Sequence, residues 1–466
     1  MISVNTIMKN KITIGKAKIC LFATLMILIY WFSSLHVQLV AVLQGKELNV
    51  FIGNGKGEKF KELCFGNKLE PSLEKLPVNL QIWRQVGNRE CRSLYEKFMV
   101  MYSVEVQEAS IKFNRKLEQK VKSWLGNDEK LYKEAQAQMI FSLQDHYNHR
   151  FTVYNAVRGK RPATGSHKPN KMFVSEPAND EKSKCDFCHP LTMTAEDNFG
   201  RIYGKYSVSA ANIFKLNKWH ALFITKQHSL FNITEVEFID LFNTAIKWFK
   251  TVNAMDHIAR YPVLFWDMFP HAGASQMHVH VHGILGTNGY PGQFGDLFSM
   301  TKNFRSKEHS YYWTSVIKMH EALGLVLRFN KVVALAPLVP HRSHELWLIS
   351  NEPCKELFQL LYYTVKMYQS GLSQFCFSMG GALPVPNQEF DPEKSLPSVI
   401  QIGTRGDCSS SVNDISSVEL YLFNNVNTDP YMTISKLHQY VEMLSSKSAS
   451  AEEDMVSYFR SFSTNW

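Results

Sequence analysis

The chain has 466 residues, of which 45% are hydrophobic and 13% aromatic, so it can form two or three domains with real cores and is not extensively disordered. Its formal net charge of +9 is modest for this length and is compatible with an anionic substrate or an acidic membrane surface. Because the sequence contains no long basic run and no known nucleic-acid motif, we expect no nucleic-acid partner.

The N-terminal segment has the pattern of a membrane anchor. Four lysines precede residues 19–43, a stretch of 25 residues without Lys, Arg, Asp or Glu. As a helix, such a stretch is long enough to cross a hydrocarbon core of roughly 30 Å. The positive-inside rule places the lysines in the cytosol. The sequence therefore predicts a single-pass membrane protein with a cytosolic tail at 1–18, a signal anchor at 19–43, and a body in the Golgi or ER lumen or outside the cell. A cleaved signal peptide is the alternative.

Residues 44–154 are predicted to form a stalk and a helical region. The stalk is rich in Gly and Lys. From Cys91 onward the chain has apolar residues at helical spacing and contains no Pro or Gly before Gly126.

After residue 200 the pattern changes to strands and helices. Strands are expected at 205–214 and 220–225, then a helix at 234–255, then strands at 261–267 and 277–285. The same order recurs with strands at 331–340 and 344–350, a helix at 354–369, and strands at 375–381 and 398–403. A histidine opens the second strand of each copy, His220 in one and His344 in the other, which indicates an internal duplication.

The most informative stretch reads "HAGASQMHVHVHG", from His271 to Gly283. In a strand, His278, His280 and His282 would project from one face, because alternate residues share a face. The small residues Gly273 to Ser275 would let an anion approach the backbone closely. Neutral imidazole is a nucleophile near pH 7, so this arrangement suits attack on a phosphate. A surface strand or a metal-chelating strand is the alternative.

A CxxC pair, Cys185 and Cys188, supplies half of a tetrahedral zinc site. No second CxxC exists, so histidines would have to complete the set, and His228 and His278 are the best placed. The alternative is a redox dithiol, although the thioredoxin-like βαβ pattern is missing. The scattered remaining cysteines do not imply a complete disulfide framework.

These motifs together resemble the histidine triad (HIT)-like superfamily. The triad motif is matched by "DMFPHAGASQMHVHVHG", and the strand before it by "HALFITKQH"; zinc-bearing members share the CxxC. With "CFSMGG" in the second copy, the chain is most similar to the galactose-1-phosphate uridylyltransferase and nucleotide phosphorylase type, which has two HIT-like halves. The resemblance implies an α+β, duplicated HIT-like fold of antiparallel sheets with packed helices. Residues 172–300 would be the catalytic half with the zinc site, and 305–440 a second, degenerate half.

The resemblance also implies roles for individual residues. His280 would be the nucleophile, and His282 would hydrogen-bond the phosphate. Ser275 and the Gly273 backbone would hold its oxygens, and His220 would support the site. A structural Zn²⁺ would be bound by four residues: Cys185, Cys188, His228 and His278.

The implied activity is transfer or phosphorolysis of a nucleotide sugar or dinucleoside polyphosphate through a covalent nucleotidyl-histidine, in a homodimer. Two departures leave alternatives open. His282 stands where the uridylyltransferases have Gln, as in the nucleotide hydrolases. Asp267 stands where the family has Asn, which is compatible with a membrane-tethered zinc- or nucleotide-binding protein that has lost catalysis.

Overall fold

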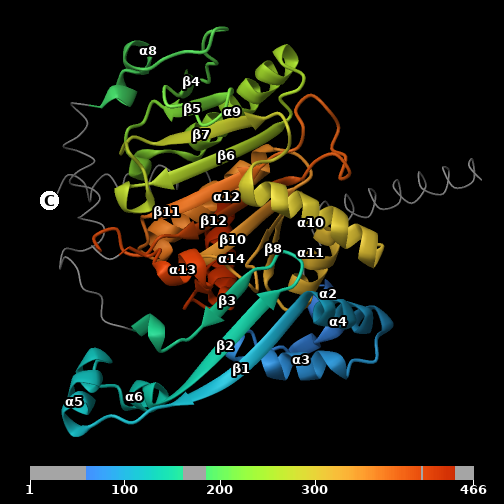
Figure 1. Ribbon diagram of the computed structural model, residues 1–466, viewed down its shortest axis with the longest axis vertical. Coiled ribbons are helices and arrows are strands. Elements are labelled where there is room, and N and C mark those ends of the chain that lie inside the picture. The colour runs from blue at the N-terminus through green and yellow to red at the C-terminus, as the bar shows by residue number, and fades with distance from the viewer. Residues whose placement is uncertain (1–58, 161–184, 411–412, 447–466) are drawn as a thin grey trace, which may run out of the picture. The chain divides into compact units, whose positions relative to one another are not determined.

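The computed structural model describes residues 59–160, 185–410 and 413–446 (Figure 1). The predicted cytosolic tail at 1–18 and the predicted anchor at 19–43 lie outside the described residues, as does the first part of the stalk.

The described chain begins with three short helices, α2 (Lys59–Cys64), α3 (Leu76–Arg84) and α4 (Arg89–Met101). A disulfide between Cys64 and Cys91 joins the end of α2 to the start of α4. The buried Trp83 donates its indole N–H to the Cys91 carbonyl over 3.0 Å, so the three helices share one small core.

The helical region predicted within 44–154 is wrong in part, because it contains two nine-residue strands. Strands β1 (Tyr102–Ser110) and β2 (Ala137–Asp145) pair antiparallel along their whole length, with the helices α5 (Arg115–Trp124) and α6 (Glu129–Gln136) between them. The strand β3 (Phe151–Tyr154) adds to β2, and the two-residue strand β13 (Asn424–Asn425) adds to β3. The nine-residue ladder outweighs the local helical pattern, as tertiary pairing commonly does.

A nine-stranded antiparallel sheet forms the centre of the described chain, in the order β4-β5-β7-β6-β11-β12-β10-β9-β8. Its first half contains β4 (Ser207–Ala211), β5 (His220–Thr225), β6 (Tyr261–Met268) and β7 (His280–Gly286). Its second half contains β8 (Val326–Phe329), β9 (Val332–Leu335), β10 (Ser343–Ser350), β11 (Phe377–Ala382) and β12 (Ser398–Thr404). The halves repeat one strand order and meet where β6 pairs with β11, as the predicted duplication requires.

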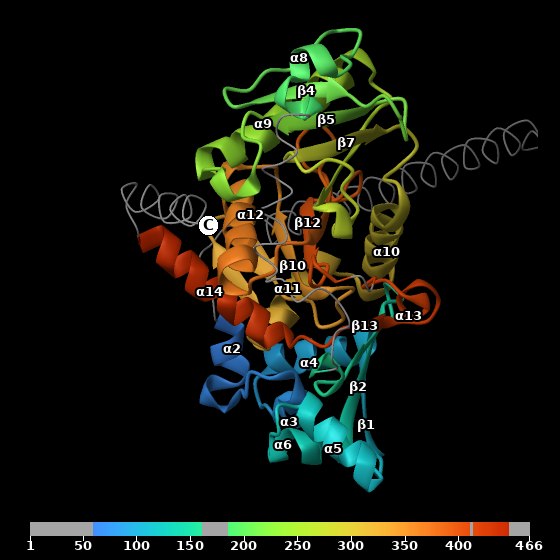
Figure 2. The ribbon, with the colours of Figure 1, turned by 90° about the vertical axis from the view of Figure 1, so that its left-hand side faces the viewer.

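Long helices cover one face of this sheet, namely α9 (Glu235–Met255), α12 (Lys355–Lys366) and α14 (Pro430–Ser446) (Figure 2). A capping box of Thr234 and Glu237 starts α9. Phe242 of α9 stacks on Phe358 of α12 with ring centroids 4.9 Å apart, so the helices of the two halves share a core.

The other face is partly covered by α10 (Gly292–Glu308), which places Phe294 over Gly380 near the join of the halves. The remaining elements are short or lie at the edges. They are α8 (Pro190–Met193), α11 (Tyr312–Ala322), α13 (Ser417–Tyr421), a π-helical turn at Met367–Gly371, and 3-10 turns at Gly66–Lys68, Leu73–Lys75, Arg158–Lys160, Asp186–Cys188, Leu230–Asn232 and Pro270–Ala272.

The predictions of an N-terminal transmembrane helix and of a single-pass membrane location are corrected. Across residues 59–160, 185–410 and 413–446, no helix has both the length and the apolar character needed to span a bilayer. Even α9, with 21 residues, carries charged side chains such as Glu237, Asp240 and Lys247. The membrane partner that we expected through this helix is therefore not supported.

Candidate active site

Two cysteines and two histidines converge beside the first half of the sheet. Cys185 caps a 3-10 turn and Cys188 is its last residue, while His228 follows β5 and His278 precedes β7. The distances from Sγ to Nδ1 are 3.2 Å for Cys185–His278, 3.3 Å for Cys188–His228 and 3.5 Å for Cys188–His278. All four donor atoms lie within 4.8 Å of one another. A tetrahedral zinc with ordinary bond lengths needs sulfur and nitrogen about 3.6 Å apart, so the donor set fits that ion.

The surroundings of His278 prepare its ring for a metal. Its Nε2 lies 2.7 Å from the Thr225 carbonyl and must carry the proton, which leaves Nδ1 free to face the thiols. Burial lowers the pKa of His278 to about 4, so the ring is neutral at physiological pH. Burial raises the pKa of the Cys185 thiol to about 12, and a bound cation is what would ionise it.

His280 opens β7, three residues later than the strand start expected at 277. It is buried, with 5% of its surface exposed, and its Nδ1–H donates to the His278 carbonyl over 2.8 Å. Its Nε2 therefore keeps a lone pair. Burial lowers the pKa of His280, opposed by that hydrogen bond and by the charge of Asp267, so the ring is neutral at physiological pH.

His220 fixes the tautomer of His282. The Leu216 amide donates to Nδ1 of His220 over 3.1 Å, so the His220 proton is on Nε2. That nitrogen lies 3.2 Å from Nδ1 of His282, which must accept, and the His282 proton is thus on Nε2. Burial lowers the pKa of His220 to about 4 and that of His282 to about 3. His282, whose ring stacks on Phe265 at 4.5 Å, is a neutral hydrogen-bond donor.

The glycine after the third histidine, Gly283, is required by packing. Its missing side chain would point toward the helical face of the sheet, where a Cβ would lie 2.7 Å from Phe223 and 3.0 Å from Phe249. The strand can therefore approach α9 closely, while the histidines occupy the opposite face.

The turn before β7 is tightly wound. Phe269 has a φ of 70° and Gly273 a φ of 114°, on either side of the 3-10 turn Pro270–Ala272. The Gly273 amide donates to the Pro270 carbonyl over 2.9 Å, so the turn itself uses the group that we expected to hold phosphate. The role of Gly273 is conformational, and Ser275 is the exposed polar residue at the end of the turn.

Asp267 lies near the end of β6, opposite Ser378 of β11. The Ser378 hydroxyl donates to Asp267 Oδ1 over 2.6 Å, and Arg405 donates to the Ser378 hydroxyl over 2.9 Å. Sequence reasoning missed Ser378 and Arg405. The serine of "CFSMGG" was the available signal, but only the pairing of β6 with β11 shows which residue it faces.

A cavity of about 940 Å³ lies in the other half of the sheet. Its walls come from the turn between β2 and β3, from α10, from His341 and Arg342 just before β10, from Gln401 of β12 and from the segment at 419–424. None of the predicted site residues lines it. The histidines and the cavity are therefore separate features of the sheet.

The sequence matches no protein-family model and no curated protein. Several solved structures are similar in fold. An ADP-glucose phosphorylase from Arabidopsis thaliana with bound ADP-glucose is 15% identical, covers 64% of this chain and 98% of its own, and has a TM-score of 0.48. A uridylyltransferase is 11% identical with a TM-score of 0.44, covering 64% of this chain and 98% of its own. A yeast Ap4A phosphorylase is 13% identical with a TM-score of 0.29, covering 70% and 98%.

These structures are of the kinds that the histidine and CxxC motifs resemble. At such identities the likeness concerns the fold and does not extend to the activity. What this site can do is decided by its own residues.

Proposed function

We propose that this chain is a nucleotidyl transferase or phosphorylase that acts on a nucleotide sugar or a dinucleoside polyphosphate through a covalent nucleotidyl intermediate on His280. The observation that carries the proposal is the 2.8 Å hydrogen bond from His280 Nδ1 to the His278 carbonyl. It holds the ring in the tautomer whose Nε2 can attack phosphorus. The chemistry is assigned to the half at 172–300, and the half at 305–440 lacks a histidine row.

In the first step the Nε2 lone pair of His280 forms a bond to the α-phosphorus. The bond from that phosphorus to the bridging oxygen breaks, and the leaving group departs with the electron pair as a sugar 1-phosphate or a nucleotide. The Nε2–H of His282 and the hydroxyl of Ser275 donate to the non-bridging oxygens as charge builds on them. His280 keeps its Nδ1 proton, which remains hydrogen-bonded to the His278 carbonyl.

In the second step an oxygen of an incoming phosphate attacks the phosphorus from the opposite side. The nitrogen–phosphorus bond breaks, and its electron pair returns to His280 Nε2. When the acceptor is inorganic phosphate the reaction is a phosphorolysis, and when it is a sugar 1-phosphate the reaction is a transfer. The two displacements give ping-pong kinetics.

Cys185, Cys188, His228 and His278 would hold Zn²⁺, which contributes folding energy at such a four-ligand site rather than reacting. His278 is both a member of this set and the residue whose carbonyl orients His280. The metal cluster is thus proposed to fix the nucleophile through one residue. The homodimer is part of the same proposal, and the molar mass in solution tests it.

Hydrolysis is the second candidate, and His282 favours it, because the third triad residue is His in the nucleotide hydrolases that the motif resembles. Water would then be the acceptor in the second step. A chain that binds zinc or nucleotide without turnover is the third candidate, and Asp267 is its one supporting residue.

The test is a mass-spectrometric search for the intermediate. The purified chain is mixed with ADP-glucose, UDP-glucose or diadenosine tetraphosphate in phosphate-free buffer and digested under alkaline conditions that preserve phosphohistidine. We expect a nucleotidyl adduct on the peptide that contains His280. His280→Ala should abolish it and lower turnover by on the order of 10⁴-fold. The exposed His257, changed to Ala, is the control and should leave both unchanged.

Adding inorganic phosphate to the adduct then separates the candidates. Release of a nucleoside diphosphate indicates phosphorolysis, and release of a nucleoside monophosphate at the same rate without phosphate indicates hydrolysis. If none of the three compounds forms an adduct or is turned over by protein that retains zinc, the proposal fails.

A further inference from the structure

A chain of hydrogen bonds from the second half of the sheet ends beside the proposed nucleophile. Arg405, which follows β12, donates through one terminal nitrogen to the Ser378 hydroxyl and to the Ala272 carbonyl, each over 2.9 Å. The hydroxyl of Ser378, on β11, donates a hydrogen bond to Asp267 Oδ1 over 2.6 Å. A hydroxyl has one hydrogen to give, so the direction of this chain is fixed from Arg405 to Asp267.

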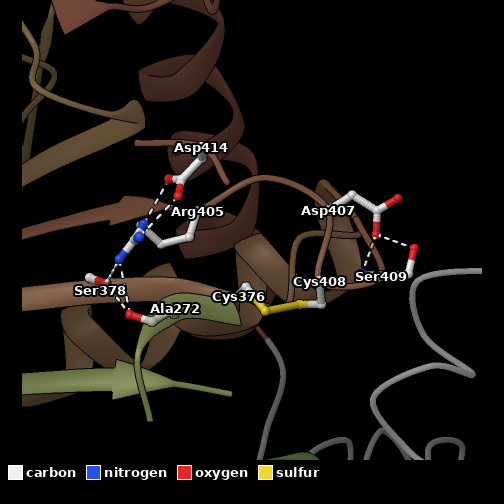
Figure 3. Close-up of a disulfide and its surroundings, with 8 residues drawn as sticks. All are labelled: Ala272, Cys376, Ser378, Arg405, Asp407, Cys408, Ser409 and Asp414. Carbon is white, nitrogen blue, oxygen red and sulfur yellow. Dashed lines mark hydrogen bonds and ion pairs between the residues drawn. A yellow bond between two sulfur atoms is a disulfide. The ribbon is translucent and has the colours of Figure 1, made fainter. Parts of the chain in front are cut away.

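The far side of Arg405 is anchored in the second half (Figure 3). Asp414 accepts from Nε over 2.7 Å and from a terminal nitrogen over 2.9 Å, which is a bidentate pair. The Arg405 amide donates to the Cys376 carbonyl over 2.8 Å. The disulfide between Cys376 and Cys408 joins the start of β11 to the loop that carries Arg405.

At its other end, this series of hydrogen bonds brings Asp267 close to the turn before β7 and to His280. A Cβ built on Gly273 would lie 3.6 Å from Asp267 Oδ2, so that oxygen is directed toward the turn before β7. Phe265 pairs with His282 in the antiparallel ladder of β6 and β7, so Asp267, two residues after Phe265, and His280, two residues before His282, are directed to neighbouring positions on the same face of the sheet. One carboxylate oxygen is therefore fixed by the second half, and the other faces the first half's site.

The charges explain why a carboxylate is tolerated there. Asp267, Asp414 and Arg405 together carry a formal charge of −1, and without the guanidinium the charge would be −2. The ring of His280 becomes cationic once its Nε2 has bonded to phosphorus. A fixed carboxylate stabilises that cation, while Arg405 limits the repulsion of the incoming phosphate.

We propose that Ser378 and Arg405 are positioning residues, supplied by the second half, that hold the Asp267 carboxylate and the turn at 270–273 in place beside His280. The disulfide Cys376–Cys408 keeps Arg405 at this point. The proposal rests on the proposed function and adds to it that the first half's chemistry depends on residues of the second half acting through Asp267.

A double-mutant cycle tests this dependence. Arg405→Met and Ser378→Ala should each slow adduct formation on His280 by about tenfold when Asp267 is present. In a chain that carries Asp267→Asn, the same changes should cost less than about twofold, because the carboxylate that they hold is gone. Equal losses in both backgrounds would mean that the two residues only support the loop, and would overturn the proposal. Arg405→Lys, which keeps the charge, guards against a variant that fails to fold.

A spectroscopic readout separates this proposal from the proposed function. Long-range ¹H–¹⁵N spectra of the histidine rings need no substrate. Ser378→Ala should shift the His280 ring signals in the parent chain and leave them in place in the Asp267→Asn chain. Unmoved His280 signals in the parent would overturn the positioning proposal, whether or not any adduct forms.

The two disulfides provide a matched comparison. Replacing Cys376 and Cys408 together by Ser should slow adduct formation, and adding Arg405→Met to that variant should cause little further loss. Replacing Cys64 and Cys91 by Ser should lower the melting temperature and leave the rate unchanged, because that disulfide joins α2 to α4. If replacing Cys64 and Cys91 slowed adduct formation as much as replacing Cys376 and Cys408, the Cys376–Cys408 disulfide would have no special role in placing Arg405.

Discussion

The two halves of the nine-stranded sheet share a strand order but place different side chains on the same face. Phe265 of β6 pairs with Gly380 of β11 at the join, and positions in the two halves can be matched by their pairing relative to these two residues. His282 pairs with Phe265, and Gln401 pairs with Gly380, so these two residues occupy corresponding positions. Two residues earlier on each strand, Val399 corresponds to His280. The second half thus keeps the strands and lacks the nucleophile.

The face that carries the histidine row in the first half contacts the N-terminal region in the second half. Gln401 accepts a hydrogen bond from Arg150 over 3.1 Å, and Arg150 also forms a 3.1 Å ion pair with Glu345 of β10. Arg150 comes just before β3, so the position that corresponds to His282 holds the N-terminal region against the sheet. Under the proposed function, the duplicated scaffold is divided between catalysis and docking of another part of the chain.

The metal cluster is the first place where the halves should behave differently. Cys185→Ala removes one of four converging ligands in the first half, and we expect the melting temperature to fall by on the order of 10 °C. Cys354→Ala removes a buried free thiol of the second half, where no such cluster forms among the described residues, and should cost only a few degrees. Thermal denaturation with and without a chelator measures both.

The chelator decides what the difference means. It should lower the melting temperature of the parent and of Cys354→Ala, and have little effect on Cys185→Ala. A Cys185→Ala variant as stable as its parent would remove the structural zinc from the proposal.

His220 and His344, which open corresponding strands, give a second contrast between the halves, with a smaller expected effect. Since Leu222 pairs with His282 and Trp347 with Gln401, the counterpart of His220 is Glu345, one residue beyond the expected His344. A register shift between Ser343 and Leu346, with a φ of 55° at His344, turns this histidine to the helical face, where its Nδ1 lies 3.3 Å from Thr433 of α14.

His220→Gln should therefore lower kcat by roughly tenfold, because it removes the group that sets the tautomer of His282. His344→Gln should leave kcat unchanged and cost about 1 kcal/mol of unfolding free energy. Steady-state kinetics with the substrate that forms the adduct, together with urea titrations, measures both. A drop in kcat for His344→Gln would show that the second half's histidine also serves the site.

The strands and helices of the two repeats could be predicted from the sequence, because hydrophobic periodicity is a local signal, and the structure brings together the four residues that we expected to converge, Cys185, Cys188, His228 and His278. The capping box at Thr234 and the apolar spacing of the helix predicted α9 to within one residue at its start. The face of the sheet on which a side chain lies was harder to predict, because one extra residue in a strand moves every later side chain to the other face. This is why His220 and His344 looked equivalent.

Long-range pairing could not be predicted at all. The links from Ser378 and Arg405 to Asp267 span 111 residues or more, and no spacing rule connects them. The strands β1 and β2 were missed for the same reason: their ladder forms across the two intervening helices, α5 and α6. Both findings depend on which segments of the chain pair with each other. The periodicity of a single segment carries no information about its partner.

The pH dependence of stability is a property in which the halves should agree. Burial lowers the pKa of His344 from 6.5 to about 4, as it does for His220. Between these values the unfolded chain binds more protons, so the contribution of His344 to stability is present above pH 6.5 and is lost as the pH falls toward 4. His344→Gln should lose less unfolding free energy over that range than its parent, with slopes that differ by up to about 1.4 kcal/mol per pH unit. Urea titrations at several pH values measure the two slopes. Parallel curves would mean that His344 is already protonated in the folded chain, and that the helical face of the second half is more accessible to water than its packing against α14 requires.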